Sequence, residues 1–181
     1  MNPNSHSTNV LVLLSGGIDS STCVEYYKKK HYKVSALFID YNQPNAAKER
    51  AAAQDIANHY DVPLLRVTLS NSKVPEGYVP ARNALLLSVA LMSMECESGI
   101  VAIGIHAGTP YVDCSLDFQR KMQDVYDLYT NGSVRIDAPF IQWTKSDIWD
   151  YAQMQNVPLN LTYSNNLSDL HPVSQTLRST L

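Results

Sequence analysis

The chain has 181 residues, of which 45% are hydrophobic and 17% charged, and it carries a formal net charge of −3 at pH 7. This length and composition predict a single globular domain over residues 1–181 that is large enough to bury a hydrophobic core. The acidic balance argues against strong nucleic-acid binding, because a nucleic-acid-binding surface gathers Lys and Arg.

Cysteine usage and hydropathy predict a cytoplasmic protein. The three cysteines, Cys23, Cys96 and Cys114, are scattered and form no metal-binding pair or disulfide framework, which favours a reducing compartment. Residues 1–8 are polar and lack the apolar core of a signal peptide. The longest apolar stretch, residues 84–94, contains two serines and is too short to cross a bilayer.

Strand-like and helix-like patterns alternate along the chain. Strands are expected at residues 10–14, 34–39, 63–68, 100–105 and 134–136. Helices are expected at 19–30, from Pro44 along an apolar stripe that reaches Tyr60, and at 82–97, 113–130 and 144–155. This alternation predicts an α/β, Rossmann-like fold with a five-stranded parallel sheet and helices on both faces. A short irregular tail, residues 159–181, follows.

The run Ser15-Gly16-Gly17-Ile18-Asp19-Ser20-Ser21 follows the first strand and opens the first helix. Two glycines let backbone N–H groups approach an anion, and the helix start adds a partial positive charge. The hydroxyls of Ser15, Ser20 and Ser21 supply further donors. The run resembles the pyrophosphate loop of the ATP pyrophosphatases and is not a Walker loop, since no Gly-Lys-Ser/Thr follows. An ordinary turn between strand and helix is the alternative.

Polar side chains also follow the second strand and open the third helix. Tyr41 and Gln43 come directly after the second strand, where a nucleotide ribose or a metal could bind, although a simple turn is an alternative. Arg82 and Asn83 stand at the start of a helix after a Gly/Pro loop. Arginine suits bidentate recognition of phosphate or carboxylate, although Arg82 could instead form a structural salt bridge.

Further candidates follow the fourth and fifth strands. Asp113 could accept hydrogen bonds from a guanine-like edge, on which Tyr111 or Phe118 could stack; alternatively, Asp113 caps its own helix. His106 alone is weak evidence for a site. Lys145 at a helix start opposes the helix macrodipole, which favours a phosphate contact over simple solvent exposure.

Together, SGGIDSS, IDYNQ with Glu49, VPARN, Tyr-x-Asp-Cys, the segment 139–145 and Thr-Tyr-Ser at 162–164 resemble the 7-cyano-7-deazaguanine synthase (QueC) family. The resemblance covers residues 10–164 and implies an adenine nucleotide alpha hydrolase-like fold. The family pattern has Gly where Ala81 stands and His where Asn45 stands.

The tail departs further from the family pattern. Family members carry a cysteine where Asn165 stands, followed by a C-x-x-C-x-x-C cluster, and these thiolates hold zinc; residues 167–181 contain no cysteine. His171 and Ser174 cannot replace them, so we expect no zinc and a tail, residues 159–181, in place of the zinc lobe.

The resemblance implies an ATP-dependent, AMP-forming carbon–nitrogen ligase. Such an enzyme adenylates 7-carboxy-7-deazaguanine, releases pyrophosphate, and lets ammonia form an amide that a second ATP converts into the nitrile. The catalytic residues implied are Asp19, Arg82 and Lys145, and Asp19 would contact Mg²⁺. ATP and pyrophosphate would bind Ser15, Gly16, Gly17, Asp19, Ser20, Ser21 and Lys145. The deazapurine would bind Tyr41, Gln43, Arg82, Asn83, Tyr111, Asp113 and Phe118.

Three alternatives compete with this interpretation. A QueC-like paralogue could pass the activated acid to another amine, for example on a protein, which the altered tail and Ala81 and Asn45 would suit. A non-catalytic nucleotide-binding module is disfavoured by the intact loop. A tRNA sulfur-transfer enzyme would need catalytic cysteines and a basic surface. We also expect a homodimer.

Overall fold

Five strands and five α-helices alternate along the part of the chain that the computed structural model describes, residues 8–70, 74 and 77–163. The strands are β1 (Asn9–Leu13), β2 (Lys33–Asp40), β3 (Leu64–Thr68), β4 (Gly99–Ala102) and β5 (Val134–Asp137). The helices are α1 (Ile18–Lys29), α2 (Ala46–Tyr60), α3 (Arg82–Met92), α4 (Leu116–Thr130) and α5 (Lys145–Met154). Two 3-10 turns, η1 (Val112–Cys114) and η2 (Leu159–Leu161), complete the set.

The strands form one parallel sheet in the order β3-β2-β1-β4-β5. Val10 of β1 lies opposite Val34 of β2 on one side and Ile100 of β4 on the other. The chain first builds outward from β1 to β2 and β3, then returns to add β4 and β5 on the other side. The order therefore reverses between β1 and β4, and ligands of such sheets bind at the carboxyl ends of the strands near this reversal.

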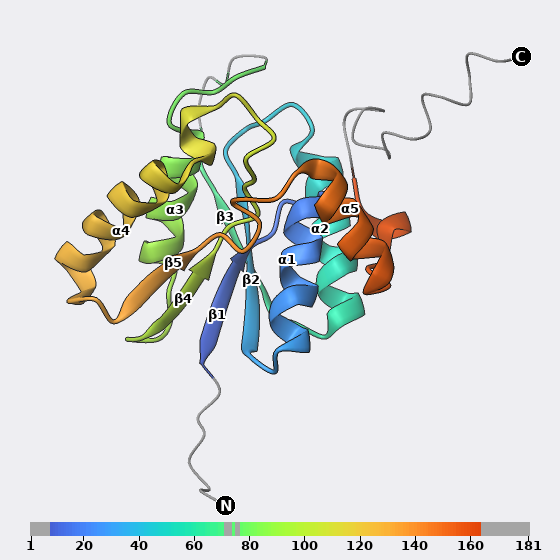
Figure 1. Ribbon diagram of the computed structural model, residues 1–181, viewed down its shortest axis with the longest axis horizontal. Coiled ribbons are helices and arrows are strands. Elements are labelled where there is room, and N and C mark those ends of the chain that lie inside the picture. The colour runs from blue at the N-terminus through green and yellow to red at the C-terminus, as the bar shows by residue number, and fades with distance from the viewer. Residues whose placement is uncertain (1–7, 71–73, 75–76, 164–181) are drawn as a thin grey trace, which may run out of the picture.

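The helices cover both faces of the sheet, as the sequence predicts (Figure 1). Val10 and Val12 point to the face covered by α1, α2 and α5, where the core includes Tyr27, Ile56 and Ile148. Leu11 points to the opposite face, in a core with Leu87 of α3 and Tyr126 of α4. Alternation along β1 thus supplies both cores, because successive strand side chains point to opposite faces.

Two expected helices differ in extent from those observed. The helix expected at 113–130 begins only at Leu116, because Ser115 has extended backbone angles and its hydroxyl accepts the Phe118 N–H at 3.2 Å. The helix expected at 82–97 ends at Met92, where the Ser93 hydroxyl donates to the Val89 carbonyl at 2.8 Å. Within the described residues, no helix is long and apolar enough to cross a membrane.

Candidate functional site

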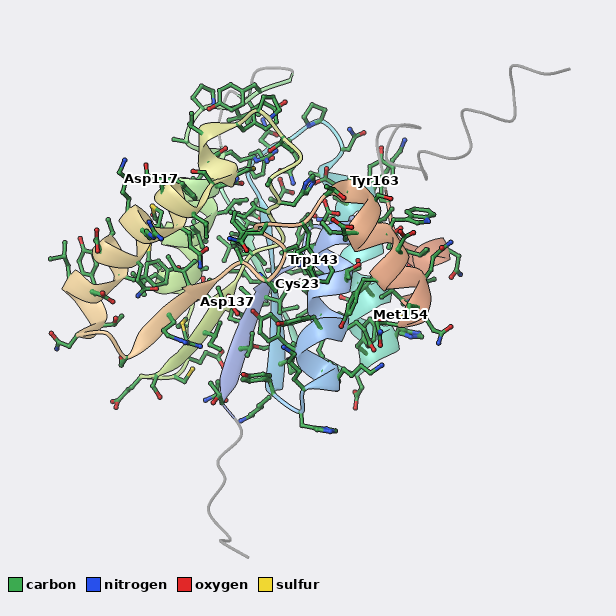
Figure 2. The ribbon with its side chains drawn as sticks, viewed as in Figure 1. Cys23, Asp117, Asp137, Trp143, Met154 and Tyr163 are labelled. Atoms are coloured by element: carbon green, nitrogen blue, oxygen red, sulfur yellow. The ribbon has the colours of Figure 1, made fainter. Side chains whose placement is uncertain are left out.

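The glycine loop between β1 and α1 is held tightly against α2. Gly16 has a φ of +80°, and a Cβ there would lie 2.6 Å from the Glu49 carbonyl oxygen and 2.8 Å from Ala52 Cβ. Only glycine fits this position, because both the backbone angle and the space exclude a side chain. The Gly16 carbonyl accepts the Tyr163 N–H at 2.9 Å, so the chain after η2 borders the loop, at the upper end of α1 in Figure 2.

The serine hydroxyls of the loop form hydrogen bonds with the loop backbone. Ser20 Oγ accepts the Ser15 N–H at 3.2 Å and lies 3.0 Å from the Gly17 carbonyl oxygen, to which it donates. Ser21 also donates to the Gly17 carbonyl, at 2.8 Å, and is buried inside the helix. No described side chain caps the start of α1, so the backbone N–H groups of its first turn point toward the loop.

A pocket of about 270 Å³ opens at the carboxyl ends of β1, β2 and β4, where the strand order reverses. Eight of the residues predicted from the sequence line it: Ser15, Gly17, Asp19, Ser20, Tyr41, Gln43, Arg82 and Asn83. Six others lie outside its lining: Gly16, Ser21, Tyr111, Asp113, Phe118 and Lys145. The structure therefore brings the phosphate-loop candidates and part of the substrate set together in one hollow.

Lys145 reaches this pocket through Asp19. Its Nζ lies 2.8 Å from Asp19 Oδ1 and 2.9 Å from Oδ2, so the ammonium bridges both carboxylate oxygens. Lys145 is the first residue of α5, and the preceding residue, Thr144, caps that helix in a capping box with Asp147. The cap fixes the direction in which the lysine leaves the helix, and the partial positive charge of the α5 N-terminus lies at the same place.

A second polar cluster joins the end of β2 to α2 and α3. Gln43 Oε1 accepts the Tyr41 N–H at 2.9 Å, and Gln43 Nε2 donates to Glu49 Oε2 at the same distance. Arg82 hydrogen-bonds the Tyr41 side chain. Burial raises the pKa of Tyr41, Glu49 acts in the same direction, and Arg82 opposes both, so the phenol stays protonated at neutral pH.

Asp113 lies beside Asn83 but does not cap α4. Its Oδ2 accepts the Asn83 N–H at 3.3 Å, and Asn83 Nδ2 donates to the Asp113 carbonyl at 3.0 Å. The carboxylate thus caps the start of α3, while Ser115 caps α4. The two aromatic candidates lie elsewhere: Tyr111 stacks on Tyr78 with ring centroids 4.9 Å apart, and Phe118 packs against the core under α3 and α4.

Gly104 is a site feature that the sequence did not single out. A Cβ on Gly104 would lie 3.0–3.1 Å from backbone atoms of Asp19 and Ser20. Glycine two residues beyond β4 therefore lets the first turn of α1 approach the sheet. A glycine inside the apolar run expected as a strand at 100–105 is the sequence signal for this contact.

The pocket fits a magnesium ion bound together with phosphates. Asp19 and Glu49 supply two carboxylates to its lining. Within the described residues, no group of three or more His, Cys, Asp or Glu side chains could hold a metal by itself. Mg²⁺ usually takes one or two protein carboxylates and completes its shell with substrate phosphates and water, which matches this donor set. The expected loss of zinc concerns residues 164–181, which lie outside the described part of the chain.

Cys23 is not available as a nucleophile. It lies one turn below Asp19 on α1 and is fully buried, with Asp137 nearby (Figure 2). Burial, followed by the charges of Asp137 and Asp19, raises the pKa of its thiol. A buried thiol of raised pKa is chemically inert, which weighs against sulfur transfer through Cys23.

The sheet order, the glycine loop and the position of the pocket define an α/β protein with an adenine nucleotide alpha hydrolase-like fold. Two solved structures share this fold. A predicted subunit of tRNA methyltransferase from Methanocaldococcus jannaschii is 19% identical with a TM-score of 0.59, over 81% of this chain and 76% of that one. NMN synthetase from Francisella tularensis is 15% identical with a TM-score of 0.57, over 92% and 68%.

The chain belongs to the QueC family. The family model described as queuosine biosynthesis protein QueC matches residues 9–71 and 64–170. The 7-cyano-7-deazaguanine synthase of Prochlorococcus marinus (strain MIT 9312) is 31% identical over 91% of this chain and 87% of that protein. The same enzyme of Campylobacter jejuni serotype O:6 is 31% identical over 87% and 84%. This chain is accordingly an ATP-dependent enzyme of ligase type.

Proposed function

We propose that this enzyme adenylates the carboxylate of 7-carboxy-7-deazaguanine and joins the activated acid to ammonia, giving 7-cyano-7-deazaguanine. The observation that carries the proposal is the single pocket in which the glycine loop and Asp19 face Arg82 and Asn83. A phosphate-binding loop and a guanidinium suited to a carboxylate thus border the same space. The names of the relatives supply the substrate class.

The reaction requires two nucleotide-dependent steps. A carboxylate oxygen attacks the α-phosphorus of ATP, the bond between the α and β phosphates breaks, and pyrophosphate leaves. Ammonia then adds to the acyl carbon, and AMP leaves with the former carboxylate oxygen. The oxygen of the resulting amide attacks the α-phosphorus of a second ATP, and a second pyrophosphate leaves. AMP then departs with that oxygen, and loss of the two amide protons leaves the nitrile. No protein side chain acts as a nucleophile.

The residues of the pocket would divide this work. Arg82 would orient the substrate carboxylate, and the N–H groups of the α1 first turn would bind the departing pyrophosphate. Mg²⁺ held at Asp19 would neutralise charge on that leaving group. Asn83, fixed by Asp113, would contact the deazapurine, and Tyr41 would hold Arg82 in place.

Lys145 would exchange partners during this cycle. In the structure both carboxylate oxygens of Asp19 are occupied by the Lys145 ammonium. A metal ion at Asp19 and a lysine contact on the phosphates both require this ion pair to open. Because both side chains are more than a fifth exposed, solvent weakens the pair, and its opening costs little.

Product analysis tests the proposal. The purified protein is incubated with ATP, Mg²⁺, 7-carboxy-7-deazaguanine and ammonium, and the products are identified by mass spectrometry. The nitrile is expected. Accumulation of amide, or of a conjugate with an added amine, would instead support the paralogue that serves a different acceptor. Absence of any acid-dependent product would contradict the proposal.

The expected homodimer also remains a proposal. The exposed side of α3 is apolar, because α3 carries no charged residue after Arg82 and its Leu85 and Met92 are exposed. Leu128 on α4 is exposed as well. A second copy of the chain would remove such apolar surface from water. Sedimentation velocity distinguishes the two states, and a single monomeric species at micromolar concentration would contradict the dimer.

A further inference from the structure

His106 is held in a turn that leaves one side of its ring facing Asp19. It lies four residues beyond β4 and is buried. The Gly108 N–H donates to His106 Nδ1 at 3.1 Å, and a Cβ on Gly108 would lie only 2.9 Å from that nitrogen. Glycine at position 108 is therefore needed for the ring to sit where it does.

This turn determines where the imidazole carries its proton. Because Nδ1 accepts a hydrogen bond, the neutral ring must be protonated at Nε2. Nε2 lies 3.8 Å from Asp19 Oδ2, within ion-pair reach but beyond hydrogen-bond distance. The Asp19 carboxylate thus lies between a donor on the β4 side, His106, and a donor on α5, Lys145.

We infer that His106 is a positioning residue for Asp19, whose carboxylate it holds once Lys145 has turned toward the phosphates. The inference rests on the proposed function, since that function requires the Lys145–Asp19 pair to open. When the ammonium leaves, a small rotation of the carboxylate brings Oδ2 within hydrogen-bond distance of the Nε2–H. Asp19 then keeps one oxygen fixed by His106 and presents the other to the metal ion. Groups that orient a metal ligand in this way commonly change metal affinity about 10–100-fold.

A packing role is the competing explanation, because buried histidines often serve only to fill space. It predicts that the imidazole nitrogen resonances do not change when Lys145 or Asp19 is substituted. The two explanations therefore differ in the response of the imidazole nitrogens to substitution of its neighbours.

Long-range ¹H–¹⁵N NMR of the ligand-free protein makes this comparison without any catalytic assay. Wild-type His106 should carry a proton at Nε2, with Nδ1 accepting the Gly108 N–H. Lys145→Gln should shift the Nε2 resonance toward a stronger hydrogen bond, and a further Asp19→Asn change should reverse that shift. Lys121→Gln on the surface of α4 is the control and should leave both nitrogens unchanged. A ring protonated at Nδ1, or one that ignores Lys145→Gln, overturns the inference.

Kinetics supply a second readout. His106→Phe keeps a ring without a donor, and His106→Gln keeps an N–H donor. His106→Phe should raise the Mg²⁺ concentration for half-maximal pyrophosphate release about 10–100-fold, with little change in KM for the acid, and His106→Gln should recover part of that loss. Equal Mg²⁺ dependence in wild type and a folded His106→Phe variant overturns the inference. If the phenylalanine variant does not fold, the NMR response decides.

The two proposals fail separately. A wild-type protein that releases no pyrophosphate refutes the proposed reaction and leaves the NMR result on the Asp19–His106 contact standing. A wild-type protein that releases pyrophosphate, but whose His106 does not respond to Lys145→Gln, keeps its function and loses the positioning role.

Discussion

At the scale of single residues, the ion pair with Asp19 explains why a lysine, Lys145, stands at the unfavourable first position of α5. A lysine at the first position of a helix opposes the macrodipole. Here its ammonium bridges both oxygens of the Asp19 carboxylate, which lies in the first turn of α1. A negative charge at that position interacts favourably with the dipole of α1. The pair also joins the two helix N-termini that border the phosphate loop.

Lys145→Gln should therefore impair catalysis far more than folding. Loss of a charge-assisted phosphate contact worth about 1.5–3 kcal/mol should lower kcat/KM for ATP by roughly 10–150-fold. The melting temperature should change little, because the pair is partly exposed. Lys121→Gln is the matched control, since both side chains of its ion pair with Asp117 are about three-quarters exposed, at 72% and 73%. Equal kcat/KM values in both variants would contradict the role of Lys145.

Some residue contacts could be predicted from the sequence and others could not. The loop from Ser15 to Ser20 follows from a local pattern of strand, glycine pair and helix. The contact of Asp113 with Asn83 joins residues 30 positions apart, so no local pattern reveals that the carboxylate caps α3 instead of α4. The clash that excludes a Cβ at Gly16 likewise comes from α2, which packs against the loop only in the folded chain.

At the scale of elements, β1, β2, β3 and β5 lie within one residue of their predicted bounds at each end, because buried parallel strands are short, continuous apolar runs. The strand predicted at 100–105 is shorter than expected, since β4 ends at Ala102. Helix ends were predicted less well. The start of α4 at Leu116 depends on the Ser115 hydroxyl, which accepts the Phe118 N–H. The hydroxyl of Ser93 gives no such signal for the end of α3, because its bond to the Val89 carbonyl has a counterpart inside the helix, from Ser88 to Ala84. Serine is common in loops and helices alike, so its presence does not mark a boundary.

The start of α3 contains a strained residue. Ala81 has a φ of +61°, in the left-handed region that costs residues other than glycine about 1–2 kcal/mol. The QueC pattern has glycine at this position. Ala81→Gly should stabilise the protein by about 1 kcal/mol, after the entropy cost of glycine. Urea denaturation measures this difference, and a destabilised variant would show that the backbone strain is not the dominant effect.

The start of α5 depends on its capping box. Thr144→Ala should destabilise the protein by about 1 kcal/mol.

The N–H and hydroxyl of Thr144 lower the pKa of Asp147. A lowered folded-state pKa means that the stabilisation is complete above the unfolded-state pKa and is lost as pH falls through the folded-state value. The stability difference between wild type and Asp147→Asn should therefore be present at pH 7 and disappear in acid; a difference that persists below pH ~2 would contradict this account.

At the scale of the whole molecule, topology brings the site together. The sheet order places β1 between β2 and β4, so the glycine loop, the polar end of β2 and the start of α3 converge on one pocket. Strict alternation of strands and helices predicts this architecture from the sequence. The sequence does not predict that Tyr111 and Phe118 lie outside the pocket, because loop geometry after β4 depends on packing against Tyr78 and the core.

Transfer of carboxylate oxygen to AMP tests the central claim most directly. The enzyme is given ATP, Mg²⁺, ammonium and 7-carboxy-7-deazaguanine labelled with ¹⁸O in both carboxylate oxygens, and the phosphorus products are examined by ³¹P NMR and mass spectrometry. Adenylation predicts AMP that carries one ¹⁸O for each ATP consumed, together with unlabelled pyrophosphate. Formation of ADP with labelled phosphate, or of AMP without the label, would contradict activation of the acid by adenylation at this site.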